Sequence, residues 1–520
     1  NWFTSPPWEK AICLRYNNPD AQYQSPLIHA ARMSGLVGGR RYRYTLPGDT
    51  DADGPRTFTA LLGAGDTHAD NQPLVLGVVG DTGQTEVTHA VFEHLRGIGG
   101  YNSGAGVDGS QSQEQIHLLL HTGDLSYADG YAPRWDSFGV LAEPLMSSVP
   151  TLTTPGNHDV TLNGLESAAF RTRYPSPHAS SKSPSPDWWS LDVGLAHVVG
   201  ISSYAPAGGR GGEMGDMHDE DNETRADNVF GTFGLAGSLA FAMREWLVRD
   251  LASVDRSKTP WVIVMFHVPW YNSNQGHYKE AERHRWGLEK VLYDAGVDVI
   301  LNGHVHSYER SSWVYDWRPD ACGPTHLVVG DGGNYEGPYG GSWRTPQPDW
   351  SKFREGSFGA GRLTIYNETA ARWRWHRTTC VEGTGTTELY NDTYFTPTGT
   401  HGQHCQSSND ISAQAMEAVD EVVFVRNVLV CPNKASGAGR AAPENKPHAE
   451  HDDACDEKCP YDSYSETRAI ATITVLTIVC VCLLASLAYV SALLRRNRNG
   501  AGAYPHARLP LGDDIFDEQL

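Results

Sequence analysis

The sequence has no excess of positive charge. Its 41 Lys and Arg residues are outnumbered by 62 Asp and Glu residues, which gives a net charge of −21 over 520 residues. A protein that binds the phosphate backbone of a nucleic acid needs clustered Lys and Arg, so we do not expect nucleic acid as a partner. Glycine and proline, 54 and 30 residues, are too few for a largely low-complexity chain. The length leaves room for two or three folded domains.

One long segment lacks charge, glycine and proline altogether. It covers residues 469–494 (AIATITVLTIVCVCLLASLAYVSALL), and Arg495, Arg496 and Arg498 follow it. A helix of this length crosses a hydrocarbon core of about 30 Å, and a basic flank is typical of the cytoplasmic side. The sequence therefore predicts a single-pass type I membrane protein with a cytoplasmic tail, residues 495–520. Its bulk would lie outside the cell or in the lumen of a secretory, endolysosomal or vacuolar compartment.

No signal peptide is visible at Asn1, so we expect a chain that has been processed or truncated. Nine cysteines fit an oxidising compartment; two of them lie in residues 469–494 and seven remain. Because seven is odd, the sequence leaves their pairing open. Three Asn-x-Thr sequons support the same compartment as glycosylation sites. They are Asn222, Asn367 and Asn391.

Short apolar runs that end in polar, glycine-rich turns recur through the middle of the chain. These runs are 74–79, 116–121, 197–202, 261–266, 298–302 and 325–330, and residues 234–254 and 279–296 between them have helical patterning. Continuous apolar strands that alternate with helices indicate a buried α/β sheet. Residues 1–70 have strand-like runs without a helical pattern, which predicts a small, incomplete β domain. Residues 401–468, rich in Pro, Ala and acid toward their end, are interpreted as a C-terminal extension and stalk.

Five motifs with chemically useful side chains follow these apolar runs. They are GDTG (80–83), GDLSY (123–127), GNHD (156–159), VMFH (264–267) and GHVH (303–306). Ligands of open α/β sheets bind beyond the carboxyl ends of the strands, so these side chains can converge on one pocket. Each motif alone is weak, because an Asp after a strand is more often a turn residue or a helix cap. The ordered set of five, each at a strand end, is much more specific.

The order of these motifs resembles the calcineurin-like metallophosphoesterases, and the tyrosine of GDLSY resembles the purple acid phosphatases in particular. The similarity continues through HVPWYNSNQGHYKEAE (267–282), GDGGNYEG (330–337) and FREGSFGAGRLTIYNETAARWRWHR (353–377), and covers roughly residues 27–377. It implies an α/β fold, with a β-sandwich-type αββα metallophosphoesterase domain over residues 71–400. Residues 1–70 would then be part of the fibronectin-type-III-like all-β domain of the larger, plant-type members.

The resemblance implies a centre of Fe(III) plus a divalent ion, for which Zn, Fe and Mn all remain open. The ligands it implies for Fe(III) are Asp81, Asp124, Tyr127 and His306. Those it implies for the divalent ion are Asn157, His267 and His304, with Asp124 as a bridge. Anionic oxygens suit the hard ferric ion, and a nitrogen-rich set suits the softer divalent ion. Charge transfer between the tyrosinate and Fe(III) gives the family its purple colour.

The resemblance also implies an acid phosphatase, which hydrolyses phosphomonoesters by in-line attack of a metal-bound hydroxide. His158 and His277 would bind phosphate or protonate the leaving group, and Asp159 would orient its neighbours. Two alternatives stay open: a phosphodiesterase or nucleotide pyrophosphatase on the same metal site, and a non-catalytic membrane glycoprotein with a vestigial metal site. The expected partners are phosphate esters and the membrane, and a homodimer is left open.

Overall fold

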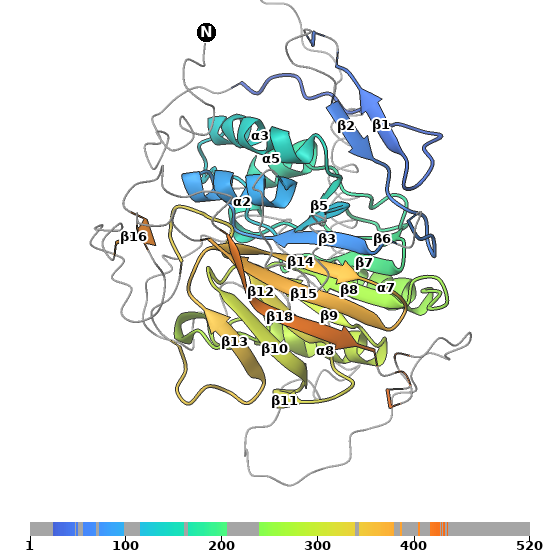
Figure 1. Cartoon of the computed structure of the whole chain (residues 1–520), viewed down its shortest axis with the longest axis vertical. Helices are drawn as coiled ribbons and strands as arrows, with labels where there is room; N and C mark the ends of the chain where they lie inside the picture. Colours follow the sequence, from blue (N-terminus) through green and yellow to red (C-terminus); the bar gives the residue numbers. More distant parts are fainter. Residues whose placement is uncertain are drawn as a thin grey trace, which may run out of the picture. The chain divides into compact units, whose positions relative to one another are not determined.

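Two β-sheets lie face to face at the centre of the structure, and helices pack on their outer faces (Figure 1). The structure is a computed structural model. It describes residues 24–434 apart from 47, 50–55, 69–71, 98–114, 161–164, 205–238, 339–342, 379–384, 387–403, 406–415, 427, 429 and 432–433. The layers follow from the apolar runs, because a strand that is apolar at every position must be covered on both of its faces.

The first sheet has six strands in the order β18-β15-β14-β3-β4-β5. The strands are β3 (Leu74–Val79), β4 (Leu118–His121), β5 (Thr151–Thr153), β14 (Gly359–Ile365), β15 (Ala370–Arg377) and β18 (Glu417–Val425). β3, β4 and β5 run parallel to one another, whereas β14, β15 and β18 are added by antiparallel pairing. The sheet thus includes a strand from the stretch interpreted as C-terminal extension.

The second sheet has eight strands in the order β11-β10-β12-β9-β8-β7-β6, and β13 also pairs with β10. The strands are β6 (Trp189–Val193), β7 (Ala196–Gly200), β8 (Trp261–Met265), β9 (Val299–Asn302), β10 (Tyr308–Tyr315), β11 (Arg318–Pro319), β12 (Thr325–Val329) and β13 (Ser351–Glu355). β7, β8, β9 and β12 form its parallel centre. The carboxyl ends of these strands therefore meet at one edge of the sheet.

The described part of the chain also contains helices and four further strands. The helices are α2 (Glu86–Arg96), α3 (Pro133–Met146), α4 (Asn157–Val160), α5 (Leu165–Arg173), α7 (Leu239–Ala252), α8 (Glu282–Asp294) and the 3-10 helix η2 (Gln275–His277). Two separate ribbons pair β1 (Arg41–Tyr44) with β2 (Arg56–Thr59) and β16 (Gly385–Thr386) with β17 (His404–Cys405). Of residues 1–70, the structure thus describes one hairpin, and the fibronectin-type-III-like domain stays a prediction.

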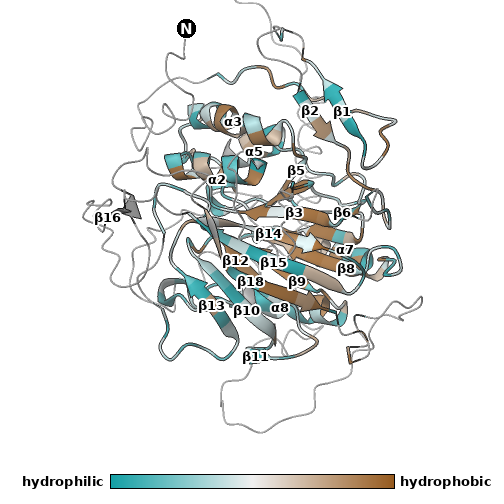
Figure 2. Cartoon of the chain, viewed as in Figure 1, coloured by the Kyte–Doolittle hydropathy of each residue, from teal (hydrophilic) through white to brown (hydrophobic). Residues whose placement is uncertain are grey.

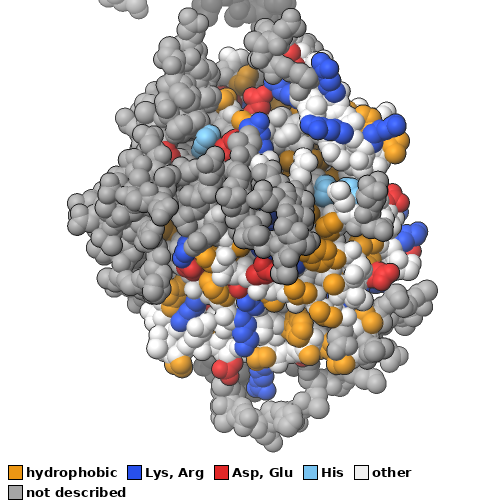
Figure 3. Space-filling model, viewed as in Figure 1, with side chains coloured by type: hydrophobic (Ala, Val, Ile, Leu, Met, Phe, Trp, Pro, Cys, Tyr) orange, Lys and Arg blue, Asp and Glu red, His pale blue; other side chains and the backbone are white. Residues whose placement is uncertain are grey.

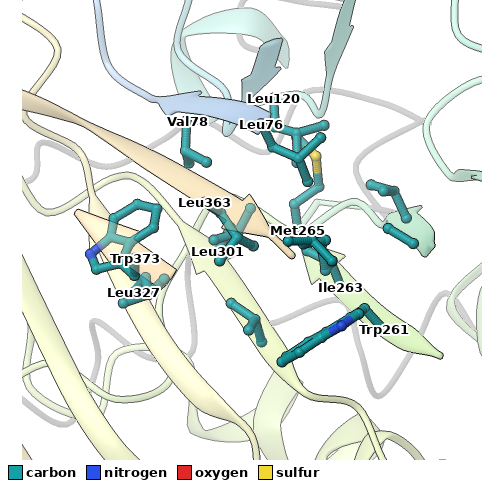
Figure 4. Close-up of a cluster of buried hydrophobic side chains, with 14 of the residues drawn as sticks. Leu76, Val78, Leu120, Trp261, Ile263, Met265, Leu301, Leu327, Leu363 and Trp373 are labelled. Atoms are coloured by element: carbon teal, nitrogen blue, oxygen red, sulfur yellow. The ribbon is translucent and has the colours of Figure 1, made fainter. Parts of the chain in front are cut away.

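Alternate residues of each central strand pack into two different hydrophobic cores, one between the sheets and one beneath the helices. Leu76 and Val78 of β3 face the core between the sheets, where they meet Met265 of β8 and Leu301 of β9 (Figure 4). Val79 of the same strand instead belongs to the outer core beneath α2 and α3. The corresponding outer core of the second sheet contains side chains of α7 and α8. Figure 2 shows the resulting hydrophobic colouring of β3 and β8. The predicted mixed α/β fold is confirmed.

The outer face of β18 is less covered. Val423 and Val425 are 55% and 56% exposed. Hydrophobic side chains are visible among polar ones on this part of the described surface (Figure 3). β18 is also an edge strand, paired only with β15 among the described strands.

Several sequence predictions fall outside the described residues. These are the segment 469–494, the tail, most of the stalk, and the sequons at Asn222 and Asn391. Among the described helices, none is long and apolar enough to cross a membrane. The third sequon residue, Asn367, is exposed in the turn between β14 and β15, where its Oδ1 accepts hydrogen bonds from Thr369 and Ala370.

Asp298, immediately before β9, anchors the end of the described chain. Its buried carboxylate lies 3.1 Å from Nη1 of Arg256, 3.2 Å from Nε of Arg426 and 3.6 Å from Nζ of Lys434. Burial raises the pKa of Asp298. The charges of the three cations, Lys434 foremost, lower the pKa by more than burial raises it, so the net shift is downward. A disulfide between Cys322 and Cys431 joins the same parts of the chain.

We expect Asp298→Ala to lower the free energy of unfolding by about 3–5 kcal/mol, because it leaves three buried cations without their anion. Urea unfolding at pH 7 measures this. The matched control is Glu421→Ala, which breaks the half-exposed pair with Arg374 and should cost less than about 1 kcal/mol. Since the folded-state pKa of Asp298 is depressed, its contribution is present at neutral pH and is lost as the pH falls through that pKa. Equal midpoints for the Asp298 variant and wild type would contradict the expectation.

Candidate metal centre

The five motifs all lie at the carboxyl ends of strands, and both sheets contribute. The side chains they carry there are Asp81 after β3, Asp124 and Tyr127 after β4, Asn157 after β5, His267 after β8, and His304 and His306 after β9. β3, β4 and β5 are neighbours in one sheet, and β8 and β9 are neighbours in the other. The strand order therefore brings the seven predicted metal ligands to one place.

One half of this cluster is rich in nitrogen. Nε2 of His267 lies 3.1 Å from Oδ1 of Asn157 and 3.1 Å from Oδ2 of Asp124. Nδ1 of His304 lies 3.0 Å from the same Asn157 oxygen. The other ring nitrogen of His267 lies 2.9 Å from the carbonyl oxygen of Thr122, which fixes the orientation of the imidazole.

The other half is rich in oxygen. The hydroxyl of Tyr127 lies 3.0 Å from Nε2 of His306 and 3.4 Å from Oδ1 of Asp81. Nε2 of His306 lies 3.5 Å from that Asp81 oxygen. Ligand atoms of Asp81, Asp124 and His267 lie within 4.8 Å of one another, so the two halves are contiguous. The structure thus brings all seven predicted side chains together.

Four of these residues have left-handed backbone conformations. The φ angles are 53° at Asp81, 56° at Asp124, 49° at Tyr127 and 68° at His304. A non-glycine residue in this region costs about 1–3 kcal/mol, and such strain is found mainly at functional sites. The surroundings compensate locally: the backbone N–H of His304 donates to both carboxylate oxygens of Asp81, at 3.0 and 2.9 Å.

Asp159 connects the loop that follows β4 with the loop that follows β5. Its carboxylate accepts the backbone N–H groups of Asp124, Leu125 and Gly156 at 2.7, 3.1 and 3.0 Å. Burial and the nearby charge of Asp124 raise the pKa of Asp159 to about 8. These contacts connect the loops that carry Asp124 and Asn157.

Two glycines allow the carboxylates to approach the backbone. A Cβ on Gly156 would lie 2.1 Å from Oδ1 of Asp124, and one on Gly303 would lie 2.3 Å from Oδ2 of Asp81. Both distances are far shorter than any van der Waals contact. The glycines of GNHD and GHVH are therefore required by the position of the two acids.

His158 lies beside the oxygen-rich half. Its ring packs on Tyr127, with centroids 4.1 Å apart, and its Nδ1 lies 2.5 Å from Oδ1 of Asp129. Burial lowers the pKa of His158, but the charges of Asp124 and Asp129 outweigh it and raise the pKa to about 10. The hydroxyl of Tyr335 donates to the other oxygen of Asp129 at 3.2 Å, which fixes the carboxylate in turn.

His277 lies beside the nitrogen-rich half through an acid that the sequence analysis did not single out. Oε2 of Glu280 lies 2.6 Å from Nδ1 of His277 and 3.2 Å from Nε2 of His304. Burial raises the pKa of Glu280, but His304 and His277 lower it more strongly, to well below its ordinary value. The three-residue spacing of His277 and Glu280 was the available signal. Tyr204, which donates to Oδ1 of Asn157 at 3.2 Å, had none in its surrounding sequence.

The electrostatics of this cluster require a cation. Asp81 and Asp124 are 0% and 1% exposed, and among the described residues no Lys or Arg forms an ion pair with either carboxylate. Burial, followed by the charges of Asp81 and Asp124, raises the pKa of Tyr127 well above its ordinary value. A bound metal ion reverses this, because it stabilises the carboxylates and the phenolate at once. The donor set, carboxylate and phenolate with imidazole and amide, fits a ferric ion beside a divalent ion.

These layers and this site define a metallophosphoesterase, and comparison with known proteins agrees. Residues 60–308 match the family described as calcineurin-like phosphoesterase, and residues 323–387 match the family described as iron/zinc purple acid phosphatase-like protein C. The chain is 36% identical to purple acid phosphatase 22 of Arabidopsis thaliana, over 68% of this chain and 70% of that protein. It is 37% identical to purple acid phosphatase 18 of the same plant, over 71% and 72%.

The chain therefore belongs to the purple acid phosphatase family. It is a metal-dependent acid phosphatase with Fe(III) plus a divalent metal as its cofactor. It is also 33% identical to the phosphoenolpyruvate phosphatase of Allium cepa, over 68% of this chain and 67% of that protein. The structure of purple acid phosphatase PPD1 from yellow lupin seeds has the same fold, with a TM-score of 0.50 at 20% identity. That match covers 75% of this chain and 60% of the lupin chain.

We expect Gly156→Ala to weaken metal binding by about 10- to 100-fold, because the new methyl group displaces the Asp124 carboxylate. Metal content after dialysis, measured by elemental analysis, tests this. The matched control is Gly139→Ala in α3, where a Cβ meets nothing within 4 Å. Alanine there should leave metal content unchanged and favour the helix slightly. Equal metal retention by the two variants would show that Gly156 does not constrain the site.

Proposed function

We propose that this chain hydrolyses phosphomonoesters at a binuclear centre with one ferric and one divalent ion. The observation that carries the proposal is the division of one buried cluster into an oxygen-rich and a nitrogen-rich half. In the proposal the ferric ligands are Asp81, Asp124, Tyr127 and His306. The divalent ligands are Asn157, His267 and His304, and Asp124 serves both ions. When bound, the two ions supply the positive charge that neutralises phosphate oxygens and activates water for in-line attack.

His158 would bind the phosphate group. Its Nδ1 contact with Asp129 fixes the imidazole and holds one proton there, which leaves Nε2 as the second donor. The carboxylate of Asp129 beside the ring favours the doubly protonated, cationic form that a phosphate oxygen prefers. Asp129 and Tyr335 are then positioning residues that act through His158.

His277 would deliver a proton to the departing alcohol. Its Nδ1 is held by Glu280, so Nε2 is the nitrogen available to the leaving oxygen. Because Glu280 also contacts His304, the proton donor is tied to the nitrogen-rich half of the cluster. Membership of the family and the complete ligand set support an enzyme over the alternative of a vestigial site.

We further propose that residues 469–494 anchor the protein in a membrane, with the catalytic unit on the lumenal or extracellular side. The uncharged run and its basic flank support this, as do the cysteine content and the sequons. The exposed turn position of Asn367 suits glycan attachment.

The test is turnover of p-nitrophenyl phosphate by the full chain in detergent, measured across pH. We expect turnover with an acidic optimum, and we expect Asp124→Asn to lower kcat by at least about 1000-fold, since both ions lose a ligand charge. Asp255→Asn, a change of the same chemistry at an exposed position, serves as the control and should leave kcat unchanged. Metal-loaded, folded protein that turns over no phosphomonoester would refute the proposal.

Tyr127→Phe tests the ferric assignment by colour. If the phenolate of Tyr127 is the ferric ligand, the variant should lose the visible charge-transfer band while retaining bound iron. Absorption spectra paired with iron analysis measure both quantities. The control is Tyr335→Phe, which removes a hydroxyl from a neighbouring ring whose centroid lies 5.3 Å from that of Tyr127. This variant should keep the band. Retention of the band in the Tyr127 variant would assign the colour to another ligand.

A further inference from the structure

Two exposed cations contact one aromatic ring of the segment that carries His277 and Glu280. Cζ of Arg344 lies 3.8 Å from the ring centroid of Tyr278. Nζ of Lys279 lies 5.6 Å from the same centroid and 5.1 Å from the centroid of Trp317. Cation–π contacts of this kind hold a charged head in place while leaving it in water. We call Lys279 and Arg344 the cationic rim.

The chain itself places Lys279 next to residues of the candidate metal centre. Tyr278 and Lys279 stand between His277 and Glu280, whose side chains meet at His304. Consecutive Cα atoms are 3.8 Å apart, so Lys279 is one residue from a carboxylate of the candidate site. Lys279 also has a left-handed backbone, with φ 62°. Such a conformation is unfavourable for a lysine and concentrates at ligand-binding segments.

Arg344 is fastened to the same segment from another part of the chain. Its backbone N–H donates to the carbonyl oxygen of Ser273 at 2.8 Å, and its carbonyl oxygen accepts from Nη1 of Arg354 at 3.1 Å. Trp343 and Asn274 form an isolated β-bridge directly beside this bond. Arg344 is therefore held against the stretch that links His267 to His277.

The neighbouring carboxylates are engaged elsewhere. Glu280 contacts His277 and His304, and Glu282 accepts two hydrogen bonds from Arg285 at 2.8 and 2.9 Å. Glu309 accepts from Ser273 and Ser351. In the part of the chain that the structure describes, neither Lys279 nor Arg344 forms an ion pair. In a chain with a net charge of −21, two exposed cations without carboxylate partners are available to an anionic ligand.

We propose that the cationic rim binds a second anionic group of the substrate and so selects phosphomonoesters that carry one. This inference rests on the proposed function and deepens it by naming the substrate class. The second anion has two chemical sources, a second phosphate ester on the same molecule or a carboxylate, and both present oxygens that a guanidinium or ammonium group binds. The rim lies outside the metal ligands, so it changes the affinity for the substrate rather than the reaction at phosphorus.

The experiment compares matched substrate pairs with the metal-loaded full chain. Propane-1,3-diol bisphosphate is compared with 3-hydroxypropyl phosphate, and 3-phosphoglycerate with glycerol 1-phosphate, because the members of each pair share the same kind of ester bond and differ by one anionic group. For the double variant Lys279→Met/Arg344→Gln, we expect kcat/KM to fall by about tenfold for the first member of each pair, through KM. The second members should change by less than about twofold. The double variant Lys258→Met/Arg249→Gln removes two other exposed cations and should change none of the four values.

Each outcome decides the inference. Selective loss for only one pair supports it and identifies that pair's anion as the source. Equal loss for all four substrates, loss through kcat alone, or no loss at all would overturn it. Binding of methylenediphosphonate, measured by calorimetry, keeps the two proposals apart: if wild type hydrolyses none of the esters, the proposed function fails. Tighter diphosphonate binding by wild type than by the double variant would still support the cationic rim, and equal binding would overturn it.

Discussion

The site depends on two carboxylates that the fold removes from water. Asp81 and Asp124 follow neighbouring parallel strands, so the sheet forces two like charges into the same dry space. Desolvation on this scale costs several kcal/mol per ion unless compensating charge is close. Part of the compensation comes from imidazoles: burial raises the pKa of Asp124, but His267 and His158 outweigh it, and the net shift is downward. We expect bound metal ions to supply the remaining compensating charge, one in the oxygen-rich half of the cluster and one in the nitrogen-rich half.

A cluster of this kind needs a rigid backbone. Four of its residues have left-handed conformations, and two glycines admit carboxylate oxygens where no Cβ would fit. Strain is stable only when the surroundings determine the conformation from several directions. Here the determinants are the core between the sheets and the three backbone hydrogen bonds that Asp159 accepts. The packed sheets thereby stabilise a loop geometry that the loops alone would not adopt.

The sequence predicted the parts of this arrangement that depend on local pattern. The runs at 74–79 and 261–266 are apolar at every position because both faces of β3 and β8 are covered, and their polar ends marked the site. The strand β15 was not among the predicted strands, because the prediction relied on continuous apolar runs. In AARWRWHR, Arg alternates with the core residues Ala371, Trp373 and Trp375. The helix α3 was not predicted either, because it has a proline in its interior and weak helical patterning.

Long-range contacts could not be predicted from one sequence. The pairing of Cys322 with Cys431 spans 109 residues and depends on how β18 returns to the sheet, so the seven cysteines outside residues 469–494 left it open. The contact of Tyr204 with Asn157 joins the end of β7 in one sheet to the end of β5 in the other, so it depends on how the two sheets pack. Glu280 was visible in the quoted motif, yet its role rests on meeting His304, which is 24 residues away. The residue types at the strand ends indicated the position of the site. The sequence did not indicate which side chains from different strands and helices contact one another.

The distribution of charge separates two tasks in this protein. At the candidate metal centre, Asp81 and Asp124 are buried acids and Glu280 is a partly buried one, and without cations they would repel a phosphate dianion. Bound cations would therefore supply much of the attraction between the centre and the reacting phosphate. The proposed cationic rim differs in kind, since Lys279 and Arg344 are exposed side chains whose positive charge needs no cofactor. Recognition of an anionic substituent at the rim is thus physically independent of metal loading, while recognition of the reacting phosphate is not.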